Sequence, residues 1–127
     1  MPFSIRRRLA SFGHAFRGVS ALLRTQHNAW LHLAATAAAL ALGFILAITR
    51  GEWLAIILAL GLVWTAEALN TAVEFLADEV SLERRELLGK AKDVGAAGVL
   101  LASAAALGVG TIVFGPRLLA YLHGHGA

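Results

Sequence analysis

The stretch AEALNTAVEFLAD, residues 66–78, continues an apolar run that begins at Trp53. Four strongly polar side chains interrupt it: Glu67, Asn70, Glu74 and Asp78. In an α-helix that advances ~100° per residue these four share a stripe roughly 80° wide, and Glu67 and Glu74 are ~10 Å apart along the axis. An ionisable group at membrane depth costs roughly 2.5–3.5 kcal/mol on insertion scales, so it usually marks a functional site. The stripe therefore predicts a site for a cation or a proton.

The composition places this stripe in a membrane protein. Of 127 residues, 58% are hydrophobic and only 15% are charged, whereas a soluble domain has about 25% charged residues. The length predicts a single domain, residues 1–127. The absence of cysteine excludes disulfides, thiolate metal sites and a cysteine nucleophile. The net charge of +3 is better explained by a basic surface facing anionic lipid than by nucleic-acid binding.

Residues 4–25 predict an amphipathic surface helix. Its apolar residues recur at alternating spacings of four and three, while its arginines lie mostly off that stripe. Such a helix suits the headgroup layer of a bilayer, although it could also be an ordinary helix packed on its own protein. The first apolar stretch begins too far from Met1 and is too long for a cleaved secretory signal. The apolar stripe consists of Ile5, Leu9, Phe12, Phe16, Val19 and Leu23.

Three membrane-spanning helices are expected after it, at 29–49, 53–80 and 94–119, which makes the protein all-α and integral to the membrane. We expect Arg50-Gly51-Glu52 to form a short turn between the first two spans. The charged segment 79–93 is expected to be helical at both ends with a break near Ser81 or Gly89. Pro116 and Arg117 are expected to close the third span.

Positive charges predict the orientation. Five Lys and Arg residues precede the first span and four lie between the second and third, whereas only Arg50 and Arg117 lie on the other side. Because positive residues concentrate in cytoplasmic segments, we expect the N-terminus and the charged segment in the cytoplasm. The Asp78 end of the stripe would then open to the cytoplasm.

This combination fits phosphoryl transfer, which needs a metal ion on the phosphates, cations on the developing charge and a carboxylate near the hydroxyl. Glu67, deepest on the stripe, suits the deprotonation of a membrane-embedded hydroxyl. Glu74 and Asp78 suit Mg²⁺, which prefers oxygen ligands, and Lys92 suits nucleotide phosphates. The sequence has no Walker-type or kinase-type glycine loop.

Two alternatives remain at this stage. The stripe could serve interhelical hydrogen bonding, or it could belong to a small oligomeric transporter or proton-coupled channel that uses Glu67 and Glu74. A transport pathway would need an ionisable group near the midplane with access to both faces. The tail histidines His123 and His125 are expected to be solvated and not to bind metal.

The run EALNTAVEFLAD, residues 67–78, followed by KAKDVGAA, residues 90–97, resembles the signature of the prokaryotic diacylglycerol kinase family. The likeness extends over residues 12–118. Several details resemble the undecaprenol kinase branch of that family: His14-Ala15-x-Arg17-Gly18, Asn28-x-x-x-His32, Glu52-Trp53 and Phe114-x-Pro116-Arg117-Leu118.

The resemblance implies an ATP-dependent lipid kinase of the bacterial inner membrane, a homotrimer of three-span subunits with active sites at the subunit interfaces on the cytoplasmic side. Its acceptor would be the primary hydroxyl of undecaprenol or diacylglycerol, with undecaprenol used at least as well. It implies that Glu67 is the catalytic base, that Asn70 orients groups in the site and that Glu74 binds Mg²⁺ and thereby ATP. The remaining residues implied near ATP are Lys92, Asp93, Glu83, Arg84, Arg85, Arg7 and His14.

One position departs from the family pattern. The family usually has a second metal-binding carboxylate just before the first span, and Gln26 stands there in this chain. An amide oxygen binds Mg²⁺ more weakly, so we expect either weaker metal binding or compensation by Asp78 or a phosphate oxygen. His32, at the entrance of the first span, is a candidate for a substrate-side role, with a simple polar anchor as the alternative.

Overall fold

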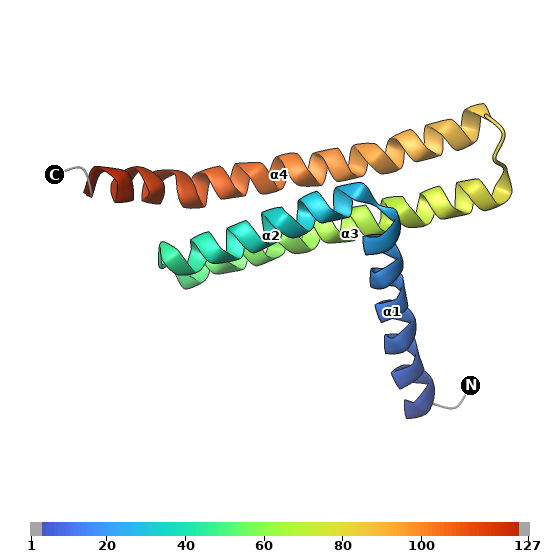
Figure 1. Ribbon diagram of the computed structural model, residues 1–127, viewed down its shortest axis with the longest axis horizontal. Coiled ribbons are helices and arrows are strands. Elements are labelled where there is room, and N and C mark those ends of the chain that lie inside the picture. Colours follow the sequence, from blue (N-terminus) through green and yellow to red (C-terminus); the bar gives the residue numbers. More distant parts are fainter. Residues whose placement is uncertain (1–3, 125–127) are drawn as a thin grey trace.

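The computed structural model describes residues 4–124, and these form four helices (Figure 1). They are α1 (Ile5–Thr25), α2 (His27–Ile45), α3 (Arg50–Val80) and α4 (Glu86–Gly124). The last three are long and apolar enough to cross a membrane. The prediction of an all-α protein with three membrane-spanning helices after an N-terminal helix is therefore confirmed. His125 lies outside the described residues.

Helices α2, α3 and α4 run alongside one another, and α1 projects crosswise from the place where α2 begins (Figure 1). α3 and α4 are antiparallel neighbours over most of their length. At one end of the bundle, which we call the turn end, lie the α2–α3 connection and the end of α4; at the other, the loop end, lies the α3–α4 loop. The 31 residues of α3 span ~46 Å, more than the ~30 Å hydrocarbon core. Part of α3 therefore extends into the headgroup region or beyond.

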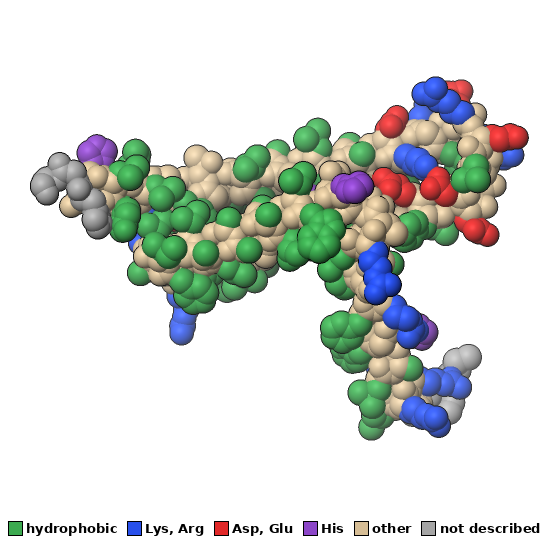
Figure 2. All heavy atoms as spheres, in the orientation of Figure 1, with side chains coloured by type: hydrophobic (Ala, Val, Ile, Leu, Met, Phe, Trp, Pro, Cys, Tyr) green, Lys and Arg blue, Asp and Glu red, His purple; other side chains and the backbone are tan. Residues whose placement is uncertain are grey.

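The surface of α1 is divided lengthwise into an apolar and a basic side. The apolar stripe is exposed from Ile5 to Val19, with values from 53% at Val19 to 73% at Phe16, and only Leu23 at its end is half-buried. In the space-filling view, hydrophobic side chains follow one side of α1 and arginines the other (Figure 2). This distribution suits a helix that lies in the headgroup layer with its apolar side toward the acyl chains.

The connection between α2 and α3 differs from the expectation. Arg50, Gly51 and Glu52 form the first turn of α3 and not a loop, so that prediction was wrong. Thr49 caps the helix: its Oγ1 accepts from the Glu52 N–H at 3.3 Å, and its own N–H donates to Glu52 Oε2 at 2.7 Å. This reciprocal capping box satisfies two N–H groups at the helix start. It explains why the helix begins before the aromatic anchor Trp53.

α4 continues beyond the third span expected at 94–119, and the break expected near Ser81 or Gly89 occurs at Ser81. The helix does not end at Pro116 and Arg117, because Pro116 lies inside it and α4 continues to Gly124. Transmembrane helices tolerate an internal proline when neighbouring groups satisfy the freed carbonyl. The break in the charged segment covers Ser81 to Arg85, while Gly89 lies within α4.

The best-packed part of the bundle is at the turn end. A hydrophobic core forms there around Ile48, Ile56, Val113 and Phe114. Arg117 joins α4 to the α2–α3 turn, since its Nη2 and Nε donate to Glu52 at 2.6 and 3.3 Å and its Nη1 donates to the Leu46 carbonyl at 3.3 Å. These contacts fix one end of the bundle and leave the polar stripe nearer the other end.

Candidate active site

The site begins with Glu67, which is 1% exposed and is the largest fully buried side chain in the described part of the chain. It lies ~25 Å along α3 from Arg50 and ~20 Å from Val80, so it is nearer the loop end than the turn end. Thr71, one turn further, donates its hydroxyl to the Glu67 carbonyl at 2.9 Å. A buried carboxylate is costly unless it has polar partners, so its neighbours decide its function.

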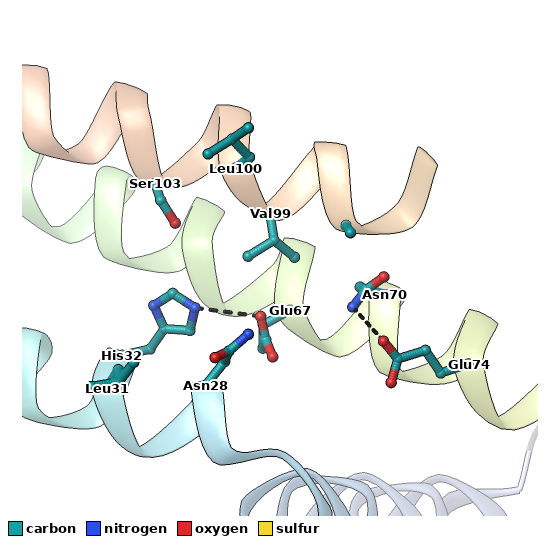
Figure 3. Close-up of a pocket in the computed structure, with 10 residues that line it drawn as sticks. Asn28, Leu31, His32, Glu67, Asn70, Glu74, Val99, Leu100 and Ser103 are labelled. Carbon is teal, nitrogen blue, oxygen red and sulfur yellow. Dashed lines mark hydrogen bonds and ion pairs between the residues drawn. The ribbon is translucent and has the colours of Figure 1, made fainter. Parts of the chain in front are cut away.

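His32 of α2 is the neighbour of Glu67. Its Nε2 lies 3.3 Å from Glu67 Oε2, close enough for an ion pair if the ring is protonated. The angles between the groups do not make a hydrogen bond, and neither atom has another partner within residues 4–124. The sequence suggested His32 as a substrate-side residue; the structure brings it against Glu67 (Figure 3).

Two turns beyond Glu67, two amides hold Glu74. Asn70 Nδ2 donates to Glu74 Oε1 at 3.2 Å, and Gln26 Nε2 donates to Glu74 Oε2 at 3.2 Å. Gln26 is the residue between α1 and α2 and the N-cap of α2. The N-terminal end of a helix carries partial positive charge. The start of α2 therefore stabilises negative charge in this part of the site, beside Glu74.

Further toward the loop end, α3 and α4 are joined by an ion pair. Lys92 Nζ lies 2.6 Å from Asp78 Oδ1, and both side chains are about half exposed. Lys92 precedes the charge-free part of α4. The pKa of Lys92 is raised above its ordinary value by the hydrogen bond to Asp78 and by the charges of Asp78 and Glu74, against a smaller opposing effect of burial. Lys92 is therefore a cation in the electric field of the stripe.

A cavity of about 360 Å³ opens beside Glu67. α2 provides Asn28, Leu31 and His32, and α3 provides Glu67, Asn70 and Glu74. The α4 side is mostly apolar (Figure 3). Leu31 and Leu100 are 69% and 70% exposed. The mouth of the cavity is therefore apolar and opens at the side of the bundle. Its α4 lining is Ala96, Val99, Leu100 and Ser103.

The Asn70 side chain can take its position only because residue 95 is glycine. A Cβ at Gly95 would overlap Asn70 Oδ1. That oxygen is buried and has no hydrogen-bond partner within the described part of the chain. The cavity is thus bordered by three unpartnered polar atoms, on Glu67, His32 and Asn70, which suits a ligand that both donates and accepts hydrogen bonds.

Other residues implied by the family resemblance are not brought to this cavity in the described part of the chain. Arg7 and His14 lie in the part of α1 that projects away from the bundle, where His14 contacts Arg17. The segment Glu83–Arg85 lies in the α3–α4 loop. Asp93 is exposed beside Lys92.

Sequence reasoning gave no role to two residues that line the cavity, Asn28 and Ser103. Asn28 had entered only as part of a branch-specific pattern, and its spacing of four from His32 places both on one face of α2. Ser103 is one of many small residues in α4, and nothing in its sequence context distinguishes it from the others.

The sequence of this chain matches the family described as "Prokaryotic diacylglycerol kinase" over residues 13–114. The chain belongs to the prokaryotic diacylglycerol kinase family. It is therefore a membrane-embedded lipid kinase, and the kinase activity implies ATP. The match includes the whole of α2 and α3 and the part of α4 that lines the cavity.

Individual relatives agree with this assignment. The chain is 35% identical to the undecaprenol kinase of Bacillus subtilis over 108 residues, which cover 85% of this chain and 88% of the relative. It is 36% identical to a diacylglycerol kinase of Synechocystis over 115 residues, 90% of this chain and 66% of the relative. It is also 44% identical to the diacylglycerol kinase of Haemophilus influenzae over 61 residues, 48% of this chain and 52% of the relative. The expected family and its undecaprenol kinase-like character are both confirmed.

Proposed function

We propose that this kinase transfers the γ-phosphate of ATP to the primary hydroxyl of undecaprenol, with diacylglycerol as a second acceptor, at the cytoplasmic face of the bacterial inner membrane. The observation that carries the proposal is the buried Glu67 carboxylate, which lines a cavity with an apolar mouth at the side of the bundle. The long match to an undecaprenol kinase supports the choice of acceptor. A polyprenol carries a single oxygen, and the mostly apolar α4 lining suits such a chain.

In this proposal Glu67 is the catalytic base and the acceptor lipid enters through the mouth formed by Leu31 and Leu100. The alcohol donates to Glu67, loses its proton to the carboxylate as its oxygen attacks the γ-phosphorus, and ADP leaves on the opposite side. Asn70 orients groups between Glu67 and Glu74, since it faces both the cavity and the Glu74 carboxylate.

The residues present fit a magnesium ion that is held mainly by ATP. Mg²⁺ is commonly bound by one or two carboxylates together with substrate phosphates, and Glu74 supplies one carboxylate. Gln26 now donates to Glu74 through its nitrogen, and rotation of its amide by half a turn would present the oxygen instead. Asp78 is the further oxygen donor on the stripe. The ion, when bound, would neutralise charge on the β- and γ-phosphates.

The nucleotide would lie toward the loop end of the bundle. Lys92, held by Asp78, provides a positive charge for the phosphates. Asp93 and the segment Glu83–Arg85 lie at the same end and would contact the rest of the nucleotide. Arg7 and His14 on α1 would complete the site from the headgroup layer.

We infer a homotrimer with its active sites at subunit interfaces, oriented with the N-terminus in the cytoplasm. Away from the cavity mouth, α4 exposes apolar residues such as Leu101, Leu107 and Ile112 that a neighbouring subunit would cover, and Gly and Ala residues along α4 allow close approach of helices in lipid. The orientation follows from nine Lys and Arg residues against two. In that orientation α1, with its arginines, lies against the anionic inner leaflet.

The alternative of a transporter or proton-coupled channel is disfavoured by the position of the acids. Glu67, Glu74 and Asp78 follow one another toward the loop end of α3, and the turn end is closed by a hydrophobic core. A transport pathway would need polar access from that end as well.

The experiment is a transfer assay with purified protein, γ-labelled ATP, Mg²⁺ and either lipid alcohol in mixed micelles. The wild type is expected to label undecaprenol at least as fast as diacylglycerol. Glu67→Gln should lower the rate by roughly 10²–10⁴-fold, while the matched change Glu79→Gln, at an exposed position of the same helix, should not alter it. A Glu67→Gln protein that folds and labels lipid at the normal rate would refute the assignment of the base.

A further inference from the structure

A fully buried base has to release its proton after every turnover. The function proposed above makes Glu67 take the hydroxyl proton of the lipid. Yet Glu67 is 1% exposed, so water reaches almost none of its surface. A neighbouring group that is more exposed would give the proton a route out of the site before Glu67 acts again.

Among the titratable side chains that line the cavity, His32 is the one that contacts Glu67, with Nε2 3.3 Å from Oε2. Its Nε2 has no hydrogen-bond partner among residues 4–124 and is free to exchange a proton. The His32 side chain is 17% exposed, against 2% for that of Glu67. The imidazole ring therefore contacts the buried carboxylate and is the more exposed of the two side chains.

The other groups around Glu67 are poor candidates. Glu74 also lines the cavity, but its two carboxylate oxygens accept from Asn70 and Gln26. Thr71 uses its hydroxyl on the Glu67 carbonyl. α4 contributes only Ala, Val, Leu and Ser side chains to this cavity, none of which titrates near neutral pH.

The His32 ring is also held in place. Trp64 packs edge-on against it, with ring centroids 6.2 Å apart and an interplanar angle of 68°. Trp64 Nε1 donates to Thr36 Oγ1 at 2.9 Å, and Thr36 Oγ1 donates to the His32 carbonyl at 2.7 Å. This chain of contacts joins α2 to α3 beside the cavity and holds the ring where Nε2 lies next to Glu67 Oε2 (Figure 3).

The geometry points to His32 as a proton relay that regenerates Glu67. As the bond from the lipid oxygen to the γ-phosphorus forms, the lipid O–H bond breaks and its proton passes to Glu67 Oε2; ADP leaves with the electron pair of the broken P–O bond. The protonated Glu67 then passes the proton to Nε2 of neutral His32. The resulting imidazolium loses a proton to water on the exposed side of the ring. One proton is released per lipid phosphorylated, and Glu67 is again a carboxylate.

Rapid-mixing assays on the full-length protein in micelles test the relay. His32→Ala should form the first phosphorylated lipid per active site within about twofold of the wild-type rate, and later turnovers should slow by roughly 100-fold. Added imidazole should restore the later turnovers of His32→Ala, because the ring can enter the vacated space. His32→Gln should show the same slow phase without rescue, since the glutamine side chain fills the space and its amide does not take up and release a proton near neutral pH. His123→Ala, at the opposite end of α4, should behave as wild type.

Three results would overturn the relay. The first is a His32→Ala or His32→Gln protein with normal later turnovers. The second is equal slowing of the first and later turnovers without imidazole rescue, which would assign His32 to substrate binding. The third is a wild type that transfers no phosphate to either alcohol, which refutes the proposed function itself and is distinguished by the absence of any first turnover.

Discussion

Gly95 of α4 lies against Asn70 of α3 so closely that a Cβ at position 95 would overlap the side-chain oxygen of Asn70. This packing holds Asn70 where its nitrogen donates to Glu74 Oε1 at 3.2 Å. The contact makes the position of the amide depend on a residue that has no functional group of its own.

Gly95→Ala is therefore expected to displace Asn70 and lower kcat by roughly 10- to 100-fold, since misplacement by about 1 Å can have an effect of this size. Gly98→Ala is the matched control, because it lies on the same helix and a Cβ there meets nothing within 4 Å. It should leave kcat unchanged. Equal rates for the two variants would show that Asn70 tolerates the shift.

The sequence predicted which residues of α3 share a face, because helical periodicity alone determines that. It also predicted the amphipathic division of α1. It did not predict that Gln26 reaches Glu74, 48 positions along the chain, or that His32 contacts Glu67. Both contacts depend on the axial position of α2 relative to α3. Packing at the turn end sets this position, because the Trp53 ring of α3 lies directly against Gly43 of α2.

The two wrong helix boundaries have local causes that the sequence contained. Arg50-Gly51-Glu52 was expected to be a turn because of its glycine and charges, but Thr49 with Glu52 three residues later forms a capping box. Pro116 was expected to close the third span, but α4 continues past it, because a proline in a membrane helix need not end the helix. In both cases we expected a glycine or proline to mark a turn, whereas the surrounding sequence or the membrane setting allows a helix.

Lys92 is expected to act on ATP and not on the lipid. Lys92→Ala should raise the KM for ATP by roughly tenfold, which corresponds to about 1.4 kcal/mol of lost binding, and should leave the KM for undecaprenol unchanged. Lys90→Ala is the control, since Lys90 pairs with Glu86 on the surface of the same helix. The measurement is initial rate against ATP concentration at saturating lipid; an equal effect of both variants would indicate a general loss of positive charge.

The Arg117–Glu52 pair is expected to stabilise the bundle without affecting catalysis. Both side chains are about 30% exposed, so the charge interaction itself is worth about 1 kcal/mol or less, and loss of the bond to the Leu46 carbonyl adds about 1 kcal/mol. Arg117→Ala should therefore lower the free energy of unfolding in detergent by about 2 kcal/mol. Arg50→Ala, exposed at the same end, should change it by less than about 0.5 kcal/mol. Equal stability of the two variants would show that the clamp contributes nothing.

Gln26→Glu tests the magnesium site directly. A carboxylate at position 26 would face Glu74, whose Oε2 now accepts from the Gln26 amide, and two adjacent carboxylates attract Mg²⁺ more strongly than one carboxylate and an amide. The Mg²⁺ concentration for half-maximal activity should fall by roughly tenfold, or about 1.4 kcal/mol. Without metal, repulsion between the two carboxylates should make Gln26→Glu less stable than wild type, and chelation by EDTA should reveal this as a lower Tm. Gln26→Ala, which loses the hydrogen bond but adds no charge, separates the two effects because it should show no gain in Mg²⁺ affinity. An unchanged Mg²⁺ requirement in Gln26→Glu would mean that Glu74 and the phosphates hold the ion without position 26.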